Sequence, residues 1–155
     1  MNLEFRTYTK NDQQCLIDMF ETNCPKYFDI KEKDEFIYYL DHYTDDNYLV
    51  ALAEDQIIGC GGLYTSDTEH RVAWVMFKNN ALGVRHLMMV ADQFYSEIEK
   101  RIIAKNKTFT IGITTTQLMA SLFSRYGFKT YKIIPDGIGK GLDAYHMNKT
   151  AYSNS

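Results

Sequence analysis

The sequence predicts an α/β fold, in which helices cover both faces of one mixed, mostly antiparallel sheet of about seven strands. Three observations support this class: short apolar runs with strand character, longer stretches with apolar residues three and four positions apart, and the order in which the two alternate. Hairpin-like strand pairs come early and strand–helix–strand connections follow, so the elements read βααβββαβαββ. The 155 residues, without repeats or a Pro/Gly/Ser-rich linker, fit a single domain over residues 1–155.

The N-terminal third contains one strand and two helices. The alternating stretch "LEFRTY" predicts a strand, and "TKND" offers Thr9 and Asn11 as caps for a helix that ends near Asn23. The chain breaks at Pro25, and a second helix starts after Asp29. Its apolar face consists of Phe36, Ile37, Leu40 and Tyr43.

Three strands follow in the middle of the chain. The stretch "NYLVALAEDQIIGCGGLYT" consists of two apolar runs joined by a tight polar turn at Glu54 and Asp55, which predicts a hairpin. A second turn at residues 66–68 leads to "EHRVAWVMFK", which reads as the next strand. A loop with one glycine, Gly83, then opens the longest helix.

That helix gives the clearest periodic signal in the sequence. Its apolar positions are Val84, Leu87, Met88, Ala91, Phe94, Tyr95, Ile98 and Ile102. The stretch "TFTIGIT" predicts a strand, and "TTQLMASLFSRY" predicts a helix with Thr115 as its N-cap and Gly127 as a left-handed C-terminal cap. Two final strands, "FKTYKII" and "GLDAYHMNK", are separated by a turn at "PDG".

Composition excludes several function classes. A net charge of −3 and a pI near 5.8 argue against a nucleic-acid partner, which needs a basic face. We expect no membrane segment, because no signal-peptide core and no apolar run of roughly 18–20 residues occurs. Three unpaired cysteines suggest reduced thiols in the cytoplasm, and the histidines lack the spacing of metal ligands, so we expect no metal.

Three stretches carry a resemblance to a known family: "YLVALAEDQIIGCGGLY", "TTTQLMASLFSRYGF" and "GKGLDAYHM". Together with the order of elements, they resemble the GNAT superfamily of acetyl-CoA-dependent N-acetyltransferases over residues 3–149. The most specific part is the helix ending in "RYGF", followed by a strand, a turn and "GLD". The resemblance implies acyltransferase activity, with acetyl-CoA donating an acetyl group to a primary amine of a small molecule or peptide.

In that family the arm of acetyl-CoA lies in a gap between two strands, and the next helix start binds the diphosphate through free N–H groups. The family's glycine-rich loop pattern falls here on Leu82, Arg85 and Leu87, so Gly83 is the one glycine, and the charges of Arg85, His86 and Lys78 would compensate. The other interpretation is a turn that merely joins strand and helix. The implied cofactor-binding residues are Met76, Phe77, Lys78, Leu82, Gly83, Val84, Arg85, His86, Leu87, Thr115, Thr116, Gln117 and Phe123.

The catalytic groups of the family are only partly present. Many members carry a tyrosine acid where this chain has Phe123, so water or Ser124 would supply the proton to the leaving thiolate. Glu69 and His70, at the entry to the strand before the loop, are candidates for the general base, although turn residues of this kind are usually solvated. Asp143 and His146 are further candidates.

The acceptor pocket is expected between the first two helices and the last hairpin. Tyr27 and Phe28 would line it, or would simply hold the helices together. Exposed sheet edges make a homodimer possible. The departures in the loop and at Phe123 also fit a degenerate domain that binds CoA or a protein partner without turnover. An open helix start favours the enzyme, whereas Leu82 or Leu87 plugging the cleft favours the binding domain.

Overall fold

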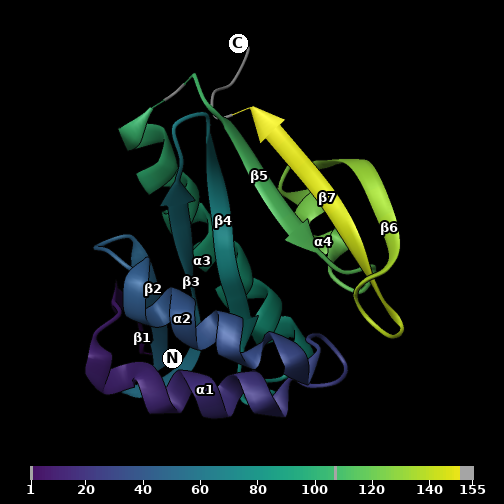
Figure 1. The fold of residues 1–155 in the computed structure, drawn as a ribbon. Coiled ribbons are helices and arrows are strands. Elements are labelled where there is room, and N and C mark those ends of the chain that lie inside the picture. Colours follow the sequence, from purple (N-terminus) through teal and green to yellow (C-terminus); the bar gives the residue numbers. More distant parts are fainter. Residues whose placement is uncertain (1, 107, 151–155) are drawn as a thin grey trace.

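The computed structural model describes residues 2–106 and 108–150, and its core is a seven-stranded sheet (Figure 1). Neighbouring strands are antiparallel except β4 and β5, which are parallel, so the mixed, mostly antiparallel sheet confirms the expected fold class. In order across the sheet the strands are β1 (Leu3–Thr7), β2 (Tyr48–Ala53), β3 (Gln56–Thr65), β4 (Glu69–Phe77), β5 (Thr110–Thr115), β7 (Leu142–Thr150) and β6 (Lys129–Gly139).

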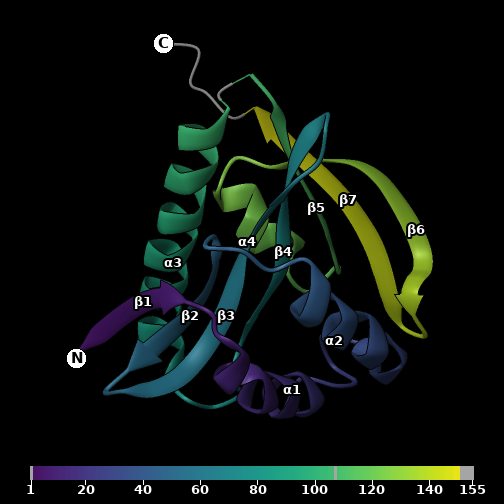
Figure 2. The ribbon, with the colours of Figure 1, turned by 60° about the vertical axis from the view of Figure 1, so that its left-hand side comes forward.

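Two pairs of helices cover the two faces of the sheet (Figures 1 and 2). The pairs are α1 (Gln13–Thr22) with α2 (Lys33–His42), and α3 (Val84–Lys105) with α4 (Ala120–Arg125). Strand β2 is buried along its whole length because its side chains alternate between two cores: Leu49 and Ala51 lie in the α3 core, and Tyr48 and Val50 lie in the α1–α2 core. Within the described residues, no helix combines the length and apolar composition needed to cross a membrane.

Side-chain caps start the first two helical segments. Thr9 caps a 3₁₀ turn (Lys10–Asp12) that leads into α1, and Asp12 accepts hydrogen bonds from the Thr9 amide at 2.9 Å and from both terminal nitrogens of Arg6 at 2.8 and 2.9 Å. The bonds from Arg6 hold the pKa of Asp12 below its usual range. Asp29 caps a second 3₁₀ turn (Ile30–Glu32) before α2. Thr9 is therefore the N-cap that the sequence offered, whereas Asn11 lies inside the turn, and the second helical segment starts after Asp29 as predicted.

A gap opens in the middle of the sheet. Strands β4 and β5 are paired only where residues 69–71 meet residues 110–112, and beyond this vertex they separate. In β4 the residues Trp74 and Val75 form a bulge opposite the single residue Gly61 of β3, and Trp74 has a left-handed φ of 46°. A Cβ atom at Gly61 would lie 3.2 Å from the Val75 Cα atom, so a glycine here lets the bulge approach β3 closely. The bulge and the separation together create the cavity described below.

Two local predictions were wrong. Helix α4 begins at Ala120, with Met119 as its N-cap, because the amides of Met119 and Ala120 both donate to the Thr116 carbonyl at 3.0 Å and form a turn first. Strand β6 continues through "PDG" to Gly139, and the hairpin turns at the next two residues. The Asp136 carboxylate accepts the Gly141 amide at 2.9 Å, which makes "PDG" an irregular step in β6.

Candidate active site

A cavity of about 510 Å³ occupies the gap between β4 and β5 and extends toward α2 and α3. Its walls come from both faces of the sheet, so one continuous space runs from the loop after β4 to the helices α1 and α2. It is lined by Asn23, Tyr27, Phe28, Glu32, Glu35, Tyr39, Tyr64, residues 71–80, Leu87, Ala91, Phe94, Tyr95, Ile98, residues 113–116, Met119, Leu122, Phe123, Tyr126 and Ile138.

The end of β4 forms one edge of the cavity, and the candidate cofactor-binding residues Met76, Phe77 and Lys78 line it. The Phe77 carbonyl accepts a hydrogen bond at 2.9 Å from the buried amide of Asn23, which ties the end of α1 to β4. Sequence reasoning missed Asn23, because its contact joins residues 54 positions apart.

The start of α3 is open to solvent. Gly83 is the N-cap, no side chain caps the helix, and the first intrahelical bond runs from the Leu87 amide to the Gly83 carbonyl at 2.9 Å. The amides of residues 84–86 therefore lack intrahelical acceptors. Val84 is 80% exposed, the side chains of Arg85 and His86 are exposed, and a Cβ atom added at Gly83 would meet nothing within 4 Å.

Of the predicted loop residues, only Leu87 lines the cavity. Leu82 is half-buried and packs against the α3 core, so it does not fill the cavity. Leu87 is half-buried in the wall. The helix start is thus exposed to solvent, and neither leucine fills the cavity.

The predicted polar cluster after β5 divides into two parts. Thr115 and Thr116 line the cavity, and the buried Thr116 hydroxyl has no hydrogen-bond partner among the described residues. Gln117 points elsewhere: its amide donates to the Gly141 carbonyl at 2.8 Å and its oxygen accepts the Asp143 amide at 2.9 Å. Gln117 thus fastens the start of α4 to the β6–β7 hairpin, and Thr115 ends β5 instead of capping the helix.

Three aromatic rings close the α4 side of the cavity. Phe123 is buried and lies edge-on to Tyr126, whose ring stacks on Tyr95 at 4.4 Å between centroids. The Tyr126 hydroxyl donates to Asp92 at 2.8 Å, and burial together with that bond raises its pKa. Tyr126 keeps its proton at neutral pH, but the proton already lies in the bond to Asp92.

The structure does not bring the three predicted catalytic residues together in the cavity. His70 is fully buried, with Nδ1 at 2.9 Å from the Thr65 hydroxyl and Nε2 at 2.9 Å from the Asn106 carbonyl, so both ring nitrogens are engaged. Ser124 is exposed on α4, and neither it nor Glu69 lines the cavity. This geometry gives no support to a base at His70 or an acid at Ser124.

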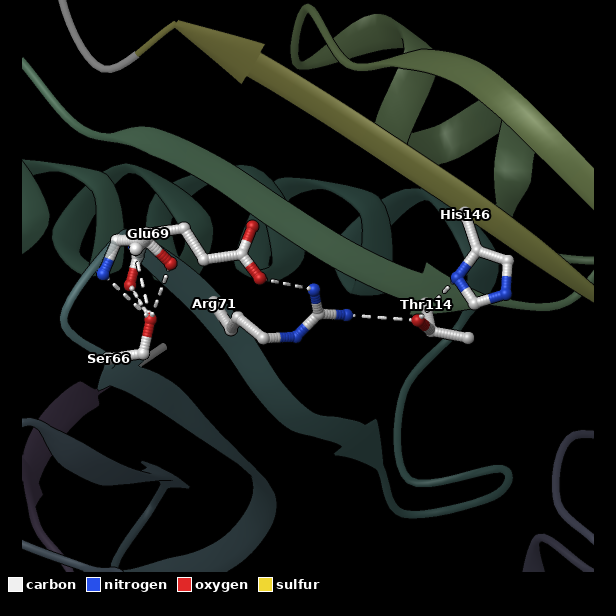
Figure 3. Close-up of polar contacts among 6 residues, drawn as sticks. Ser66, Glu69, Arg71, Thr114 and His146 are labelled. Atoms are coloured by element: carbon white, nitrogen blue, oxygen red, sulfur yellow. Dashed lines mark hydrogen bonds and ion pairs between the residues drawn. The ribbon is translucent and has the colours of Figure 1, made fainter.

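Glu69 instead belongs to a polar chain that crosses the vertex of the gap (Figure 3). Its Oε1 atom accepts from Nη1 of Arg71 at 3.0 Å, and Nη2 of Arg71 donates to the Thr114 hydroxyl at 2.9 Å. The Thr114 oxygen also lies 3.1 Å from Nδ1 of His146 on β7. Arg71 and Thr114 both line the cavity, and no sequence pattern had singled them out.

The wall on the α1–α2 side is aromatic and acidic. Phe28 stacks on Trp74 with ring centroids 6.1 Å apart, and Tyr27 also lines this wall. Glu32 and Glu35 carry the acidic charge, and burial raises the pKa of Glu32. The signal that could have revealed these carboxylates is their i,i+3 spacing at the start of α2.

The comparisons with known proteins identify the fold. No protein-family model matches the sequence, and no curated protein is significantly similar to it. Ard1 from Thermoplasma volcanium superposes with a TM-score of 0.79 at 14% identity, covering 99% of this chain and 100% of that one. An aminoglycoside 6'-N-acetyltransferase complexed with coenzyme A gives 0.70 at 13% identity, with 100% and 99% covered.

The ribosomal-protein-S18-alanine N-acetyltransferase from Escherichia coli gives a TM-score of 0.70 at 11% identity, with 99% of this chain and 97% of that chain covered. Another similar structure is a putative acetyltransferase of the GNAT family from Desulfovibrio desulfuricans, with a TM-score of 0.75 at 15% identity and coverage of 97% and 100%. The chain therefore has the GNAT fold over nearly its whole length.

Proposed function

We propose that this protein is an N-acetyltransferase that transfers an acetyl group from acetyl-CoA to a primary amine of a small molecule or peptide. The observation that carries the proposal is the cavity between β4 and β5, which runs from the edge of β4 to an acidic, aromatic wall on the far side of the sheet. A coenzyme arm and an acceptor can therefore meet inside one space. The fold of the similar structures supports the same reaction class.

The coenzyme would lie with its diphosphate at the start of α3. The free amides of residues 84–86 and the partial positive charge of a helix N-terminus favour a diphosphate there, and Arg85 and His86 add side-chain donors. The pantetheine arm would extend into the gap, where β4 beyond Arg71 has no paired strand on the β5 side. Backbone groups of β4 can then bond to the arm as they would to another strand.

The reaction needs little from acidic or basic side chains. The acceptor amine first releases its ammonium proton to solvent. The neutral amine then attacks the thioester carbonyl carbon, a C–N bond forms, the C–S bond breaks, and CoA leaves as a thiolate. Amides near Phe77 would polarise the carbonyl oxygen. We assign these proton transfers to water, since Phe123 has no acidic proton and the Tyr126 hydroxyl is bonded to Asp92. The proton that the amine loses on attack also passes to solvent, and the thiolate takes one up.

The acceptor would enter from the α1–α2 side and carry positive charge. Glu32 and Glu35 line that wall, and the described residues place no lysine or arginine within ion-pair distance of either carboxylate. Aromatic faces such as those of Tyr27 and Phe28 also attract cations. A cationic amine therefore fits this wall better than an anionic one.

Calorimetric titration with acetyl-CoA tests the proposal. We expect micromolar binding, weakened about fivefold by Arg85→Ala because an exposed ion pair contributes modestly. Lys100→Ala, which removes one positive charge from an exposed position near the other end of α3, is the control and should bind as the parent does. Absence of binding at millimolar acetyl-CoA would contradict the proposal. Binding without turnover of any cationic amine would instead indicate a CoA-binding domain.

A further inference from the structure

Arg71 lies where the backbone pairing between β4 and β5 ends. It is the last residue of β4 that pairs with β5, opposite Gly112, and the cavity begins at its side chain. Past this pair the separation of the two strands is not set by backbone hydrogen bonding. Something else must determine how wide the gap is.

The Arg71 guanidinium spans the two strands past the last pair (Figure 3). Nη2 reaches across to the hydroxyl of Thr114, two residues beyond Gly112 on β5, while Nη1 is held by Glu69 on its own strand. Thr114 is in turn held by His146, so the bridge continues into β7. A planar guanidinium gives each of these bonds a fixed direction, which a flexible ammonium would not.

The absence of a side chain at Gly112 leaves room for the bridge against the β5 backbone. A Cβ atom at Gly112 would lie 2.9 Å from Nη1 of Arg71 and 3.0 Å from Oε2 of Glu69. The ion pair therefore lies directly over the glycine, against the β5 backbone. Any side chain at this position would push the guanidinium away from Thr114.

We propose that Arg71 is a positioning residue that sets the width of the β4–β5 gap and so controls binding of the pantetheine arm. This inference rests on the proposed function. The arm occupies the gap, whereas the nucleotide portion of the coenzyme binds at the start of α3. A change at Arg71 therefore affects the part of the ligand inside the gap and spares the part outside it.

Two probes separate these effects: CoA, and 3′-phosphoadenosine 5′-diphosphate, which is the nucleotide portion without the arm. Arg71→Met keeps an unbranched, flexible side chain at this position and removes both directed bonds. We expect it to weaken CoA binding about tenfold, in line with the loss of charge-assisted hydrogen bonds, and to leave nucleotide binding within about twofold. Arg85→Ala is the matched control, and it should weaken both ligands by the same factor.

Thr114→Val removes the other end of the bridge and keeps the charge at Arg71. It should also weaken CoA binding. The double variant should bind CoA no more weakly than Arg71→Met alone, because both substitutions remove the same Arg71–Thr114 hydrogen bond. Arg71→Lys should recover only part of the loss. If Arg71→Met does not fold, as judged by thermal unfolding, Thr114→Val carries the test.

Two results would overturn the inference while leaving the proposed function intact: unchanged CoA affinity in these variants, or an equal loss for CoA and for the nucleotide. An equal loss would mean that the substitution disturbs the whole domain. If the parent protein binds neither ligand, the proposed function itself fails, and the inference fails with it.

Discussion

The two ends of the cavity are built by opposite means. At the vertex, strands β4 and β5 are paired, and Arg71, Glu69 and Thr114 fill the space with directed contacts over Gly112. At the mouth, which we define as residues 78–87, Gly83 has open space around it and the first turn of α3 lies in solvent. The vertex is complete without a ligand. At the mouth, the amides of residues 84–86 lack intrahelical acceptors.

The specificity of such a site therefore resides at the vertex more than at the mouth. A solvated helix start binds anions through groups that every protein chain possesses, so its sequence can drift from a glycine-rich pattern and keep the chemistry. The vertex depends on contacts between particular side chains, so its residues cannot be substituted as freely. Substitutions at the two ends should therefore have unequal effects on CoA binding.

The largest difference should come from placing valine at each glycine. Gly112→Val forces a side chain into the Arg71–Glu69 pair, so we expect at least a tenfold loss of CoA affinity. The free energy of unfolding should fall by no more than about 1 kcal/mol, because the displaced atoms are the ends of flexible side chains. Gly83→Val adds its side chain to open space at φ −65° and ψ 159°, which any residue adopts, so unfolding should change by less than about 1 kcal/mol. Denaturant titration and calorimetry measure both quantities. Equal losses of CoA affinity at the two sites would refute the contrast.

An intermediate effect should appear in amide hydrogen exchange. The amides of residues 84–86 lack intrahelical acceptors, so they should exchange rapidly in the free protein and at least roughly tenfold more slowly with bound CoA. Amides of the paired residues 110–112 should be protected equally in both states. Mass spectrometry of matched peptides gives the comparison. Protection that appears only at the vertex would place the diphosphate elsewhere.

The smallest effect should be the response to salt. Exposed charges at the mouth are screened as ionic strength rises, so CoA affinity of the parent should fall a few-fold between roughly 0.05 and 0.5 M salt. This salt-dependent loss of affinity should be smaller for Arg85→Ala than for the parent. For Arg71→Met it should equal that of the parent, because the guanidinium of Arg71 is already paired with Glu69. A salt response that flattens in Arg71→Met instead would show that its charge faces the diphosphate.

The elements at the mouth could be placed from the sequence more readily than the contacts at the vertex, for a physical reason. Strand alternation and helix periodicity are local, so the edge of β4 and the start of α3 could be placed from adjacent residues such as Lys78 and Leu87. The bridge at Arg71 depends on parallel pairing with β5, about forty residues later, and on the absence of a side chain at Gly112. No residue near Arg71 in the sequence indicates this pairing register.

The same limit explains the misplaced catalytic residues. Glu69 and His70 were chosen because they precede the strand, which is a local criterion. The pleat of β4 then turned His70 into the sheet interior, where Thr65 and Asn106 engage it, and turned Glu69 toward Arg71. Gln117 was expected at the coenzyme, but the β6–β7 hairpin, which is distant in sequence, supplies both partners of its amide.

The bulge in β4 has a practical consequence for spectroscopy. Trp74, at the bulge, lines the cavity and is the one tryptophan in the chain. Its indole contacts the rings of Phe28 and Phe36, and neither phenylalanine absorbs at the wavelengths that excite indole selectively. Fluorescence excited selectively at the indole, where the twelve tyrosines do not absorb, therefore originates from Trp74 alone on the cavity wall. Quenching or a shift of the emission maximum would report ligand binding in real time, without a label and without a substitution.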